Sequence, residues 1–488
     1  MAFIKYSVLK KVSVFTYLFC FIGLYCEAQA IFNSTEEEIY RDISSLRLQN
    51  AKKQLKTVNT SSEAYLSHLL FSVEFLLTES SQSYDTLINN QDKYFEIIEK
   101  APDSPWKLYF IAEMKLRGAF IDAKLGNELS AAWQLRQAYK TITDNLVMYP
   151  DFEPNNKTIG LLHVLLGAVP DQYQWVINLL GMEGDITKGI NELQAFSEIQ
   201  SIFSEEAELM VIAVQAYLLN ESNKAAEKAY NKYLQQPENE LIDYLTVAVL
   251  LKNAEANKAL SVLNEITVAE NPMLYYQMGE VLLQLGDYDK SITAFNRFLS
   301  VFKGENFIKD ANYKLFLAHW LNDDITKAME YRAKALAYGQ KLIEVDKHAD
   351  KMLQQDEMPN KAIMQLRLYT DGGLYSKAKS LINEYDHTDF ESTDHRLEYT
   401  YRKARYYHKT NQIDKATNHY MQVISMQKGN FYFAPNSCLQ LGYIFEELNQ
   451  NDKAHYYFKR VLTYSNYEYK NSISNKAKTA LKSLKSNS

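Results

Sequence analysis

Cysteine is scarce in this chain of 488 residues, which has three copies, Cys20, Cys26 and Cys438. The first two fall in a leader-like segment, so removal of that segment leaves only Cys438. A single cysteine cannot form an intramolecular disulfide, even in an oxidising compartment. Packing must therefore hold the fold together, and we expect Cys438 to be a small buried apolar residue.

Glycine and proline are also scarce, with 16 and 9 copies. Few helix-breaking residues favour long uninterrupted helices. Hydrophobic residues make up 47% of the chain and aromatic residues 13%, which is typical of a packed protein rather than a disordered one. The formal net charge is −7, and the two signs are mixed along the chain, so the sequence lacks the basic stripe of a nucleic-acid-binding protein.

Motifs that carry catalytic or metal chemistry are missing as well. The chain has no glycine-rich phosphate loop followed by Lys-Ser/Thr, no His-Glu-x-x-His, no Cys-x-x-Cys and no Gly-x-Ser-x-Gly. His387 and His395 lie among Asp386, Asp389 and Asp394, but no regular element there would hold them as metal ligands. We therefore expect no cofactor, no metal and no enzymatic activity. An enzyme with its site in the central glycine-rich segment is the weakest of the hypotheses.

The first thirty residues are typical of a secretory signal peptide. Three lysines within the first eleven residues precede an uncharged apolar run over 12–25, and small residues then mark a cleavage site after Ala30. The apolar run is shorter than the ~20 residues that span a bilayer, so an uncleaved anchor is the weaker alternative. Cys26 fits a lipoprotein signal poorly because the residue before it is large. We expect an exported protein, periplasmic or secreted and of a bacterial envelope, with no transmembrane helix after cleavage and at most a peripheral association with the envelope.

A helix-pair pattern recurs from about residue 200 to the C-terminal end. The clearest copy runs from Pro272 to Phe302, with Gly279 in its first helix and Ser291 in its second. Two tightly packed helices require a small residue where they cross, with bulky residues on either side. The crossing residues, spaced 34, 32, 37, 50, 38 and 38 apart, are Ala225, Ala259, Ser291, Ala328, Ala378, Ala416 and Ala454.

These small and large positions resemble the tetratricopeptide repeat, whose period is about 34 residues. The resemblance implies an all-α fold, a right-handed α-solenoid of antiparallel helix pairs. The gap of 50 indicates an extra element around residues 338–355, which we interpret as an extended second helix. We divide the chain into a signal peptide (1–30), divergent N-terminal helical pairs (31–148), a Gly/Pro-rich helical hairpin (149–199), tetratricopeptide-like repeats (200–466), and a C-terminal capping helix with its tail (467–488).

Residues 149–193 break the repeat pattern. Prolines and glycines gather there, which indicates helices that approach closely or backbone with positive φ. We interpret the segment as a helical hairpin that joins two halves of the solenoid; the alternative is a binding hinge in which His163, Tyr173 and Trp175 line a pocket. A histidine within an apolar run is more often a core residue than a ligand. A short motif here resembles one in the tetratricopeptide-39 and inclusion-body-clearance family of helical outer-membrane-associated proteins: Val169-Pro170, Leu179-Leu180-Gly181-Met182, Gly184-Asp185, Gly189 and Leu193.

The resemblance to tetratricopeptide repeats implies a concave groove lined by the first helix of each pair. The residues that line this groove combine aromatic rings with charged side chains, a mixture typical of peptide-binding sites. Carried onto this sequence, they are Tyr244, Tyr276, Glu280, Tyr313, Trp320, Arg367, Tyr401, Arg405, His408, Tyr443 and Glu446. Because the chain has 36 tyrosines, the alternative is that many of these rings fill the core between repeats.

We therefore expect an exported, non-catalytic scaffold that binds a protein or peptide partner in its groove. The alternative function is a glycan- or nutrient-binding helical protein of the outer membrane, which would stack sugars on exposed rings such as Trp320 and Tyr313. The sequence does not identify the partner.

Overall fold

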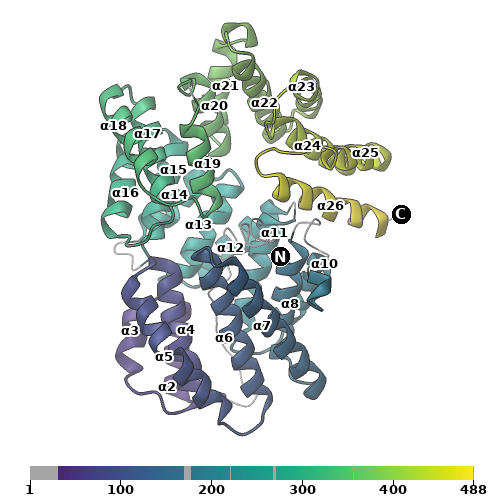
Figure 1. Cartoon of the computed structure of the whole chain (residues 1–488). Helices are drawn as coiled ribbons and strands as arrows, with labels where there is room; N and C mark the ends of the chain where they lie inside the picture. Colours follow the sequence, from purple (N-terminus) through teal and green to yellow (C-terminus); the bar gives the residue numbers. More distant parts are fainter. Residues whose placement is uncertain (1–30, 170–176, 220, 267–270, 356, 487–488) are drawn as a thin grey trace.

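The computed structural model describes residues 31–169, 177–219, 221–266, 271–355 and 357–486 (Figure 1). Every regular element within these ranges is a helix. Successive helices are joined by short turns, pack against each other as antiparallel pairs, and the pairs stack into a solenoid. The predicted fold class is therefore confirmed.

The N-terminal helices stack in pairs ahead of the repeats, and side chains cap the starts of three of the six. Asn33 and Glu36 form a capping box at α2, Thr60 and Glu63 form one at α4, and Pro105 opens α6. Such caps satisfy backbone N–H groups that have no partner within the helix. These helices are α2 (Ser34–Ser44), α3 (Leu48–Gln54), α4 (Ser61–Thr78), α5 (Ser81–Glu99), α6 (Pro105–Lys124) and α7 (Glu128–Met148).

The central segment is built on two helices, α8 (Pro154–Gly167) and α10 (Ile186–Ser197), that pack closely. A Cβ atom at Gly189 would lie 2.5 Å from the carbonyl oxygen of Gly160, so this approach requires glycine. His163 is buried, and its Nδ1 lies 2.6 Å from the Glu192 carboxylate, as expected for a satisfied core histidine. Tyr173 and Trp175, which were predicted to line a pocket with it, lie outside the described residues.

The helix pairs that follow carry the repeat pattern. All seven crossing residues have 0% of their surface exposed, and a Cβ atom at Gly279 would lie 2.7 Å from the Phe295 ring. The repeat alignment drawn from the sequence therefore marks the real helix contacts. The pairs are α11 (Ser204–Tyr217) with α12 (Ser222–Gln235), α13 (Glu240–Lys252) with α14 (Ala256–Asn264), α15 (Met273–Leu285) with α16 (Tyr288–Val301), α17 (Ile308–Leu321) with α18 (Ile325–Ala337), α20 (Lys361–Asp371) with α21 (Tyr375–Glu384), α22 (Thr393–Lys409) with α23 (Ile413–Met426), and α24 (Phe433–Glu447) with α25 (Asn451–Val461).

A separate helix, α19 (Glu344–Leu353), occupies the long gap between two crossing residues. The interpretation of this stretch as an extended second helix was wrong. The chain leaves α18 at Ala337 and turns at Gly339, whose φ is +81°. Asp346 then accepts hydrogen bonds from the backbone N–H groups of Phe307 (2.8 Å) and Asp310 (2.9 Å), which draws α19 against the start of α17.

The last helix, α26 (Lys470–Ser486), packs on α24 and α25 and returns to the central hairpin (Figure 1). The Asn475 amide donates to the carbonyl oxygen of Ala168 (2.6 Å), and Lys482 pairs with Asp185 (2.6 Å). The solenoid therefore closes on itself through α26 instead of remaining open. Within the described residues, none of the helices has both the length and the apolarity needed to cross a bilayer.

Candidate functional site

The groove residues predicted from the sequence all lie on first helices, from α13 to α24. Tyr313, Tyr401 and Tyr443 are buried within clusters of apolar side chains between helices. These three rings therefore fill the core between repeats, which was the alternative interpretation, and they do not form the groove surface.

Three of the predicted residues meet in one cavity: Tyr244, Tyr276 and Glu280. The cavity has a volume of about 340 Å³ and lies between α11, α13 and α15, where Tyr217 adds a third aromatic ring. Residues 343–345, at the start of α19, cover one side of it. We call this cavity the tyrosine pocket.

The polar groups of the tyrosine pocket are held by an ion-pair network. The Tyr276 hydroxyl donates to the Asp310 carboxylate (2.5 Å) and accepts from the Lys314 ammonium (2.6 Å), which also pairs with Glu280 (2.5 Å). Burial and then the charge of Asp310 raise the pKa of Tyr276, so its hydroxyl stays protonated. The Gln284 carboxamide oxygen, also at this pocket, has no hydrogen-bond partner among the described residues.

A second cavity, of about 400 Å³, lies between α19, α20, α22 and residues 431–433. It contains the predicted residue Arg367, whose Nε lies 3.8 Å from the Asp371 carboxylate. The two terminal nitrogens of Arg367 make no hydrogen bond with the described residues. We call this cavity the arginine pocket.

Two further side chains in the arginine pocket were not predicted from the sequence. Arg402 is held by Glu398 (2.5 Å) and by the Tyr432 hydroxyl (3.1 Å). His348 comes from α19, and neither of its ring nitrogens has a partner among the described residues. Burial, followed by the charge of Arg367, lowers the pKa of His348 to about 3, so the ring is neutral and offers one donor and one acceptor.

Trp320 lies beside this pocket, but its indole already contacts other residues of the chain. The indole N–H donates to the carbonyl oxygen of Pro359 (2.9 Å), and the Lys361 ammonium lies 4.5 Å above the ring. A cation over the face of an indole is attracted by the ring electrons. This ring is therefore engaged by the chain itself.

The remaining predicted residues join neither pocket. Arg405 pairs with Asp371 (2.5 Å), and His408 lies 3.3 Å from the Tyr420 hydroxyl. Burial lowers the pKa of His408 to about 4, so this ring is neutral too. Glu446, near the end of α24, is half-buried, and burial raises its pKa.

The division of the inner surface into two pockets depends on α19. Its first residues border the tyrosine pocket, while His348 and Met352 border the arginine pocket, so α19 lies between the two cavities. The sequence signalled α19 only through the gap of 50 residues between Ala328 and Ala378. That spacing shows that an element is inserted, but not where the element folds.

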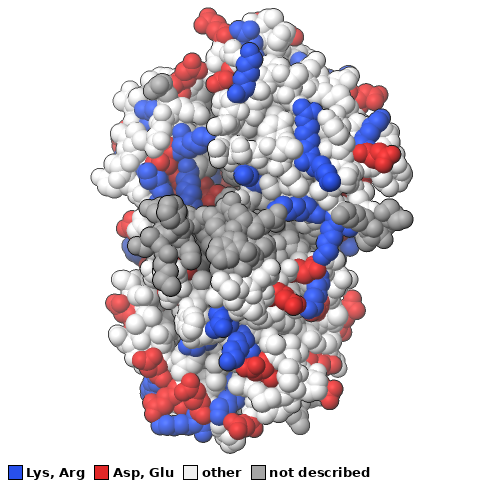
Figure 2. All heavy atoms as spheres, turned by 45° about the vertical axis from the view of Figure 1, so that its right-hand side comes forward, with Lys and Arg blue, Asp and Glu red and all other residues white. Residues whose placement is uncertain are grey.

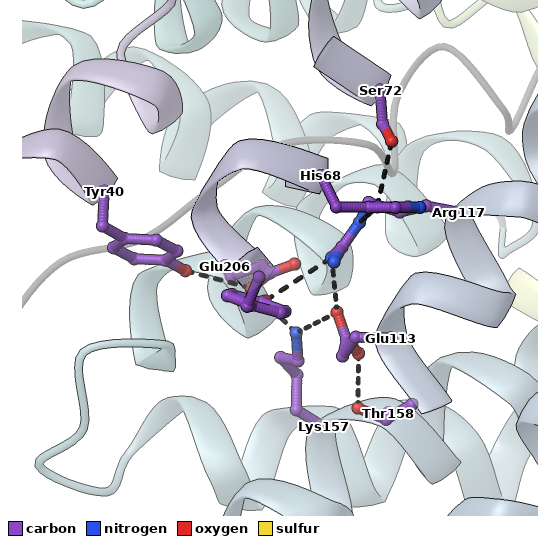
Figure 3. A network of polar contacts seen from close by, with 9 residues as sticks. Tyr40, His68, Ser72, Glu113, Arg117, Lys157, Thr158 and Glu206 are labelled. Atoms are coloured by element: carbon purple, nitrogen blue, oxygen red, sulfur yellow. Dashed lines mark hydrogen bonds and ion pairs between the residues drawn. The ribbon is translucent and has the colours of Figure 1, made fainter. Parts of the chain in front are cut away.

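A network of buried charges joins the N-terminal helices to the central segment (Figure 3). Lys157 of α8 lies between Glu206 (2.9 Å) and Glu113 (3.2 Å), and these side chains are 1%, 11% and 6% exposed. Glu113 also pairs with Arg117 (3.3 Å) and accepts from the Thr158 hydroxyl (2.6 Å). Two cations and two carboxylates thus balance inside the core, where neither pocket reaches.

The pKa values of the two carboxylates in this network shift in opposite directions. Burial raises the pKa of Glu206 to about 7, and the negative charge of Glu113 acts in the same direction. Burial alone would also raise the pKa of Glu113, but Lys157 and Arg117 outweigh it, so this pKa is lowered. The network therefore connects α6, α8 and α11 through a charge balance that depends on Lys157.

A family model described as the tetratricopeptide repeat matches residues 274–303 and 397–430. The chain contains tetratricopeptide repeats. The two matched segments correspond to the pairs α15–α16 and α22–α23, and the buried crossing residues extend the tetratricopeptide pattern to the pairs between and beside them. No curated protein matches the sequence.

Several solved structures are similar to this tetratricopeptide chain at low identity. A Rap protein in complex with competence and sporulation factor is 12% identical, with a TM-score of 0.32 over 91% of this chain and 98% of that one. The apo quorum sensor NprR from B. thuringiensis is 12% identical, with a TM-score of 0.30 over 88% and 97%. A human IFIT1 dimer with PPP-AAAA is 12% identical, with a TM-score of 0.26 over 89% and 91%. Likeness at this level says nothing about the ligand of this chain.

Proposed function

We propose that the protein is an exported scaffold that binds a segment of a protein or peptide partner along its inner surface. The observation that carries this proposal is a set of polar atoms in two adjacent pockets that have no partner in the described chain. They are the terminal nitrogens of Arg367, both ring nitrogens of His348 and the carboxamide oxygen of Gln284. The His348 and Gln284 atoms are buried, and buried polar groups in folded proteins are nearly always hydrogen-bonded, so these atoms are suited to a bound chain. The Arg367 side chain is 27% exposed and can reach the same ligand.

The dimensions of the pockets suit an extended peptide. Cavities of about 340 and 400 Å³ each admit a few side chains, and α19 separates them. The partly exposed rings of Tyr217 and Tyr244 supply contact area at a low entropy cost, whereas the Tyr276 ring is itself buried. The Arg367 guanidinium can bind a carboxylate or a carbonyl oxygen. A peptide that places one side chain in each pocket would satisfy both.

The glycan alternative is less well supported by these contacts. A sugar stacks on an open aromatic face, but Lys361 covers Trp320 and Tyr313 is buried in the core. The two rings chosen for that hypothesis are thus unavailable for stacking. A partner that donates and accepts hydrogen bonds along a backbone fits the unpaired atoms better.

Export rests on the leader-like sequence and is part of the same proposal. Cleavage after Ala30 would leave Phe32 as the second residue, and its ring is 2% exposed and stacks on Phe110 at 6.3 Å. We expect the intact mass of the protein purified from its source to correspond to a chain that begins at Ile31. A chain that keeps Met1 and fractionates with the cell interior would contradict export.

Affinity purification from the source cell tests the binding surface. We compare the intact protein with Arg367→Ala in the arginine pocket, and with Arg297→Ala on the exposed side of α16 as a matched control. The intact and control proteins should capture the same partner, and Arg367→Ala should lose it while its circular dichroism is unchanged. Equal capture by all three would show that the partner binds elsewhere.

A further inference from the structure

The polar side chains that α15 presents to the tyrosine pocket offer acceptor atoms that have no partner. Gln277, Glu280 and Gln284 line the pocket together, because positions i, i+3 and i+7 lie on one face of a helix. The Gln277 Nε2 group donates to the carbonyl oxygen of Tyr244 (3.0 Å), which leaves its Oε1 atom as an acceptor. This Oε1 atom and that of Gln284 are buried without a hydrogen-bond partner among the described residues. A group that donates hydrogen bonds therefore suits this face of α15 better than a group that accepts them.

Negative charge is also in excess on the α15 side of the pocket. Glu280 and Asp310 share the single ammonium of Lys314, at 2.5 and 2.7 Å. The Glu280 side chain is 29% exposed and uses only Oε1 in this contact, so its Oε2 atom can accept from a ligand. Burial and then the charge of Glu280 raise the pKa of Tyr217 on the facing helix, as a carboxylate near that ring would. Two carboxylates with one ammonium leave a negative charge that a bound cation would balance.

Two further charged side chains line the pocket, Glu344 and Lys252. Glu344 pairs with Lys347 (3.0 Å), so its charge is balanced within the chain. Lys252, at the end of α13, is exposed, and its ammonium lies 5.9 Å from the centre of the Tyr217 ring. Lys252 makes no ion pair with the described residues, so its flexible side chain can leave the ring to another cation.

Aromatic rings complete the surface that a cation would meet. The rings of Tyr217 and Tyr244 are partly exposed and line the pocket, and the face of an aromatic ring attracts a positive charge. The outer surface gives no such preference, since Figure 2 shows acidic and basic side chains interspersed over the face that it presents. Selection of a positive group would therefore arise inside the pocket.

We propose that the tyrosine pocket binds the cationic side chain of a lysine or arginine in the partner. Ammonium and guanidinium groups carry only donors, so they can pair with Glu280 and donate to the carboxamide oxygens of α15. The apolar stem of either side chain can pack on the two partly exposed tyrosine rings, and a cavity of about 340 Å³ has room for it. This inference rests on the proposed function and adds to it a basic residue in the partner segment. The arginine pocket would repel that residue, so the two pockets together set the direction of the segment.

An array of short peptides, probed with the full chain at physiological ionic strength, tests this preference. Each peptide carries lysine, arginine, norleucine or glutamate at its centre, between random neutral residues. Norleucine has the stem of lysine without its charge, and we expect lysine or arginine peptides to bind at least about tenfold more tightly than norleucine peptides. Preference for lysine alone indicates an ammonium site, preference for arginine alone indicates a guanidinium site, and preference for both indicates selection by charge. Binding without a preference for either cation would overturn this inference and leave partner binding standing, whereas binding of no peptide would overturn both.

Matched variants separate the pocket from the net negative charge of the chain, which attracts any basic peptide. Glu280→Gln and the exposed control Glu227→Gln on α12 change that net charge equally. Glu280→Gln should lose most of the preference for cations, while the control should keep it within about twofold. Lys252→Gln removes a like charge beside Tyr217 and should strengthen the binding of basic peptides; since Lys252 is exposed, this variant tests the site even if Glu280→Gln misfolds. A preference that survives in folded Glu280→Gln, or weaker binding by Lys252→Gln, would refute the site.

Discussion

Replacement of Lys157 by methionine should destabilise the N-terminal half of the molecule strongly. The side chain is 1% exposed, and its ammonium lies 2.9 Å from Glu206 and 3.2 Å from Glu113 (Figure 3). Methionine fills a similar volume but leaves two buried carboxylates with only Arg117 to balance them. Removal of one partner from a buried ion pair costs about 3–5 kcal/mol, which is a large part of the stability of an ordinary domain.

Urea unfolding and hydrogen exchange measure this loss and locate it. We expect faster exchange in α6, α8 and α11, while the exposed control Lys140→Met changes little. Adding Glu206→Gln to Lys157→Met removes the uncompensated carboxylate and should restore at least about 1 kcal/mol, since the two sites are in contact and their effects are not additive. A loss below about 1 kcal/mol in Lys157→Met, or no recovery in the double variant, would refute the charge-balance argument.

Three more predictions follow from buried groups. Gly279→Ala should cost about 1–3 kcal/mol, since its Cβ would lie 2.7 Å from the Phe295 ring, and a loss under about 0.5 kcal/mol in urea would contradict this. The pKa of Glu206 is raised from 4.5 to about 7, so the stability of the intact protein relative to Glu206→Gln should fall as the pH rises from about 4.5 to about 7. At about 1.4 kcal/mol per pKa unit the fall is on the order of 3 kcal/mol, and denaturant curves at pH 5 and pH 8 that show the opposite slope would count against it. Burial raises the pKa of the Cys438 thiol to about 11, so a thiol reagent at pH 8 should react only as the protein unfolds, and rapid labelling of the folded protein would contradict its burial.

The repeat register could be read from the sequence because helix crossings restrict residue size. At Ala225 and Ala416, as at the other crossing positions, a larger side chain would push the two helices apart, so small residues recur at a nearly constant spacing. The glycines of the central hairpin likewise indicated helices that approach closely, and Gly160 and Gly189 do meet. Small residues at a regular spacing and glycines clustered in a short segment can both be recognised in a sequence.

The features that shape the inner surface were not visible in this way. The position of α19 depends on Asp346 bonding to the start of α17, and the return of α26 depends on Asn475 reaching Ala168. Contacts between residues so far apart in the chain leave no periodic trace. The burial of Tyr313 and Tyr401 follows from the same packing, which is why helix position alone could not separate groove rings from core rings.

One missed feature did carry a signal. Lys157 is the only Lys, Arg, Asp or Glu in α8, most of whose later residues are apolar, and a lysine that is buried with such a helix must find carboxylates. The sequence could therefore have indicated a buried ion pair in α8. It could not have named Glu113 and Glu206, which lie 44 and 49 residues away on other helices.

Site-specific photocrosslinking in the native cell tests the proposed inner binding surface most directly. A photoreactive phenylalanine replaces Gln355 at the arginine pocket or Glu280 at the tyrosine pocket, and Thr293 or Asn418 on the exposed sides of α16 and α23 in the controls. We expect one protein to crosslink at both pocket positions and at neither control position. Crosslinks at the control positions only, or none from either pocket, would contradict an inner-surface scaffold.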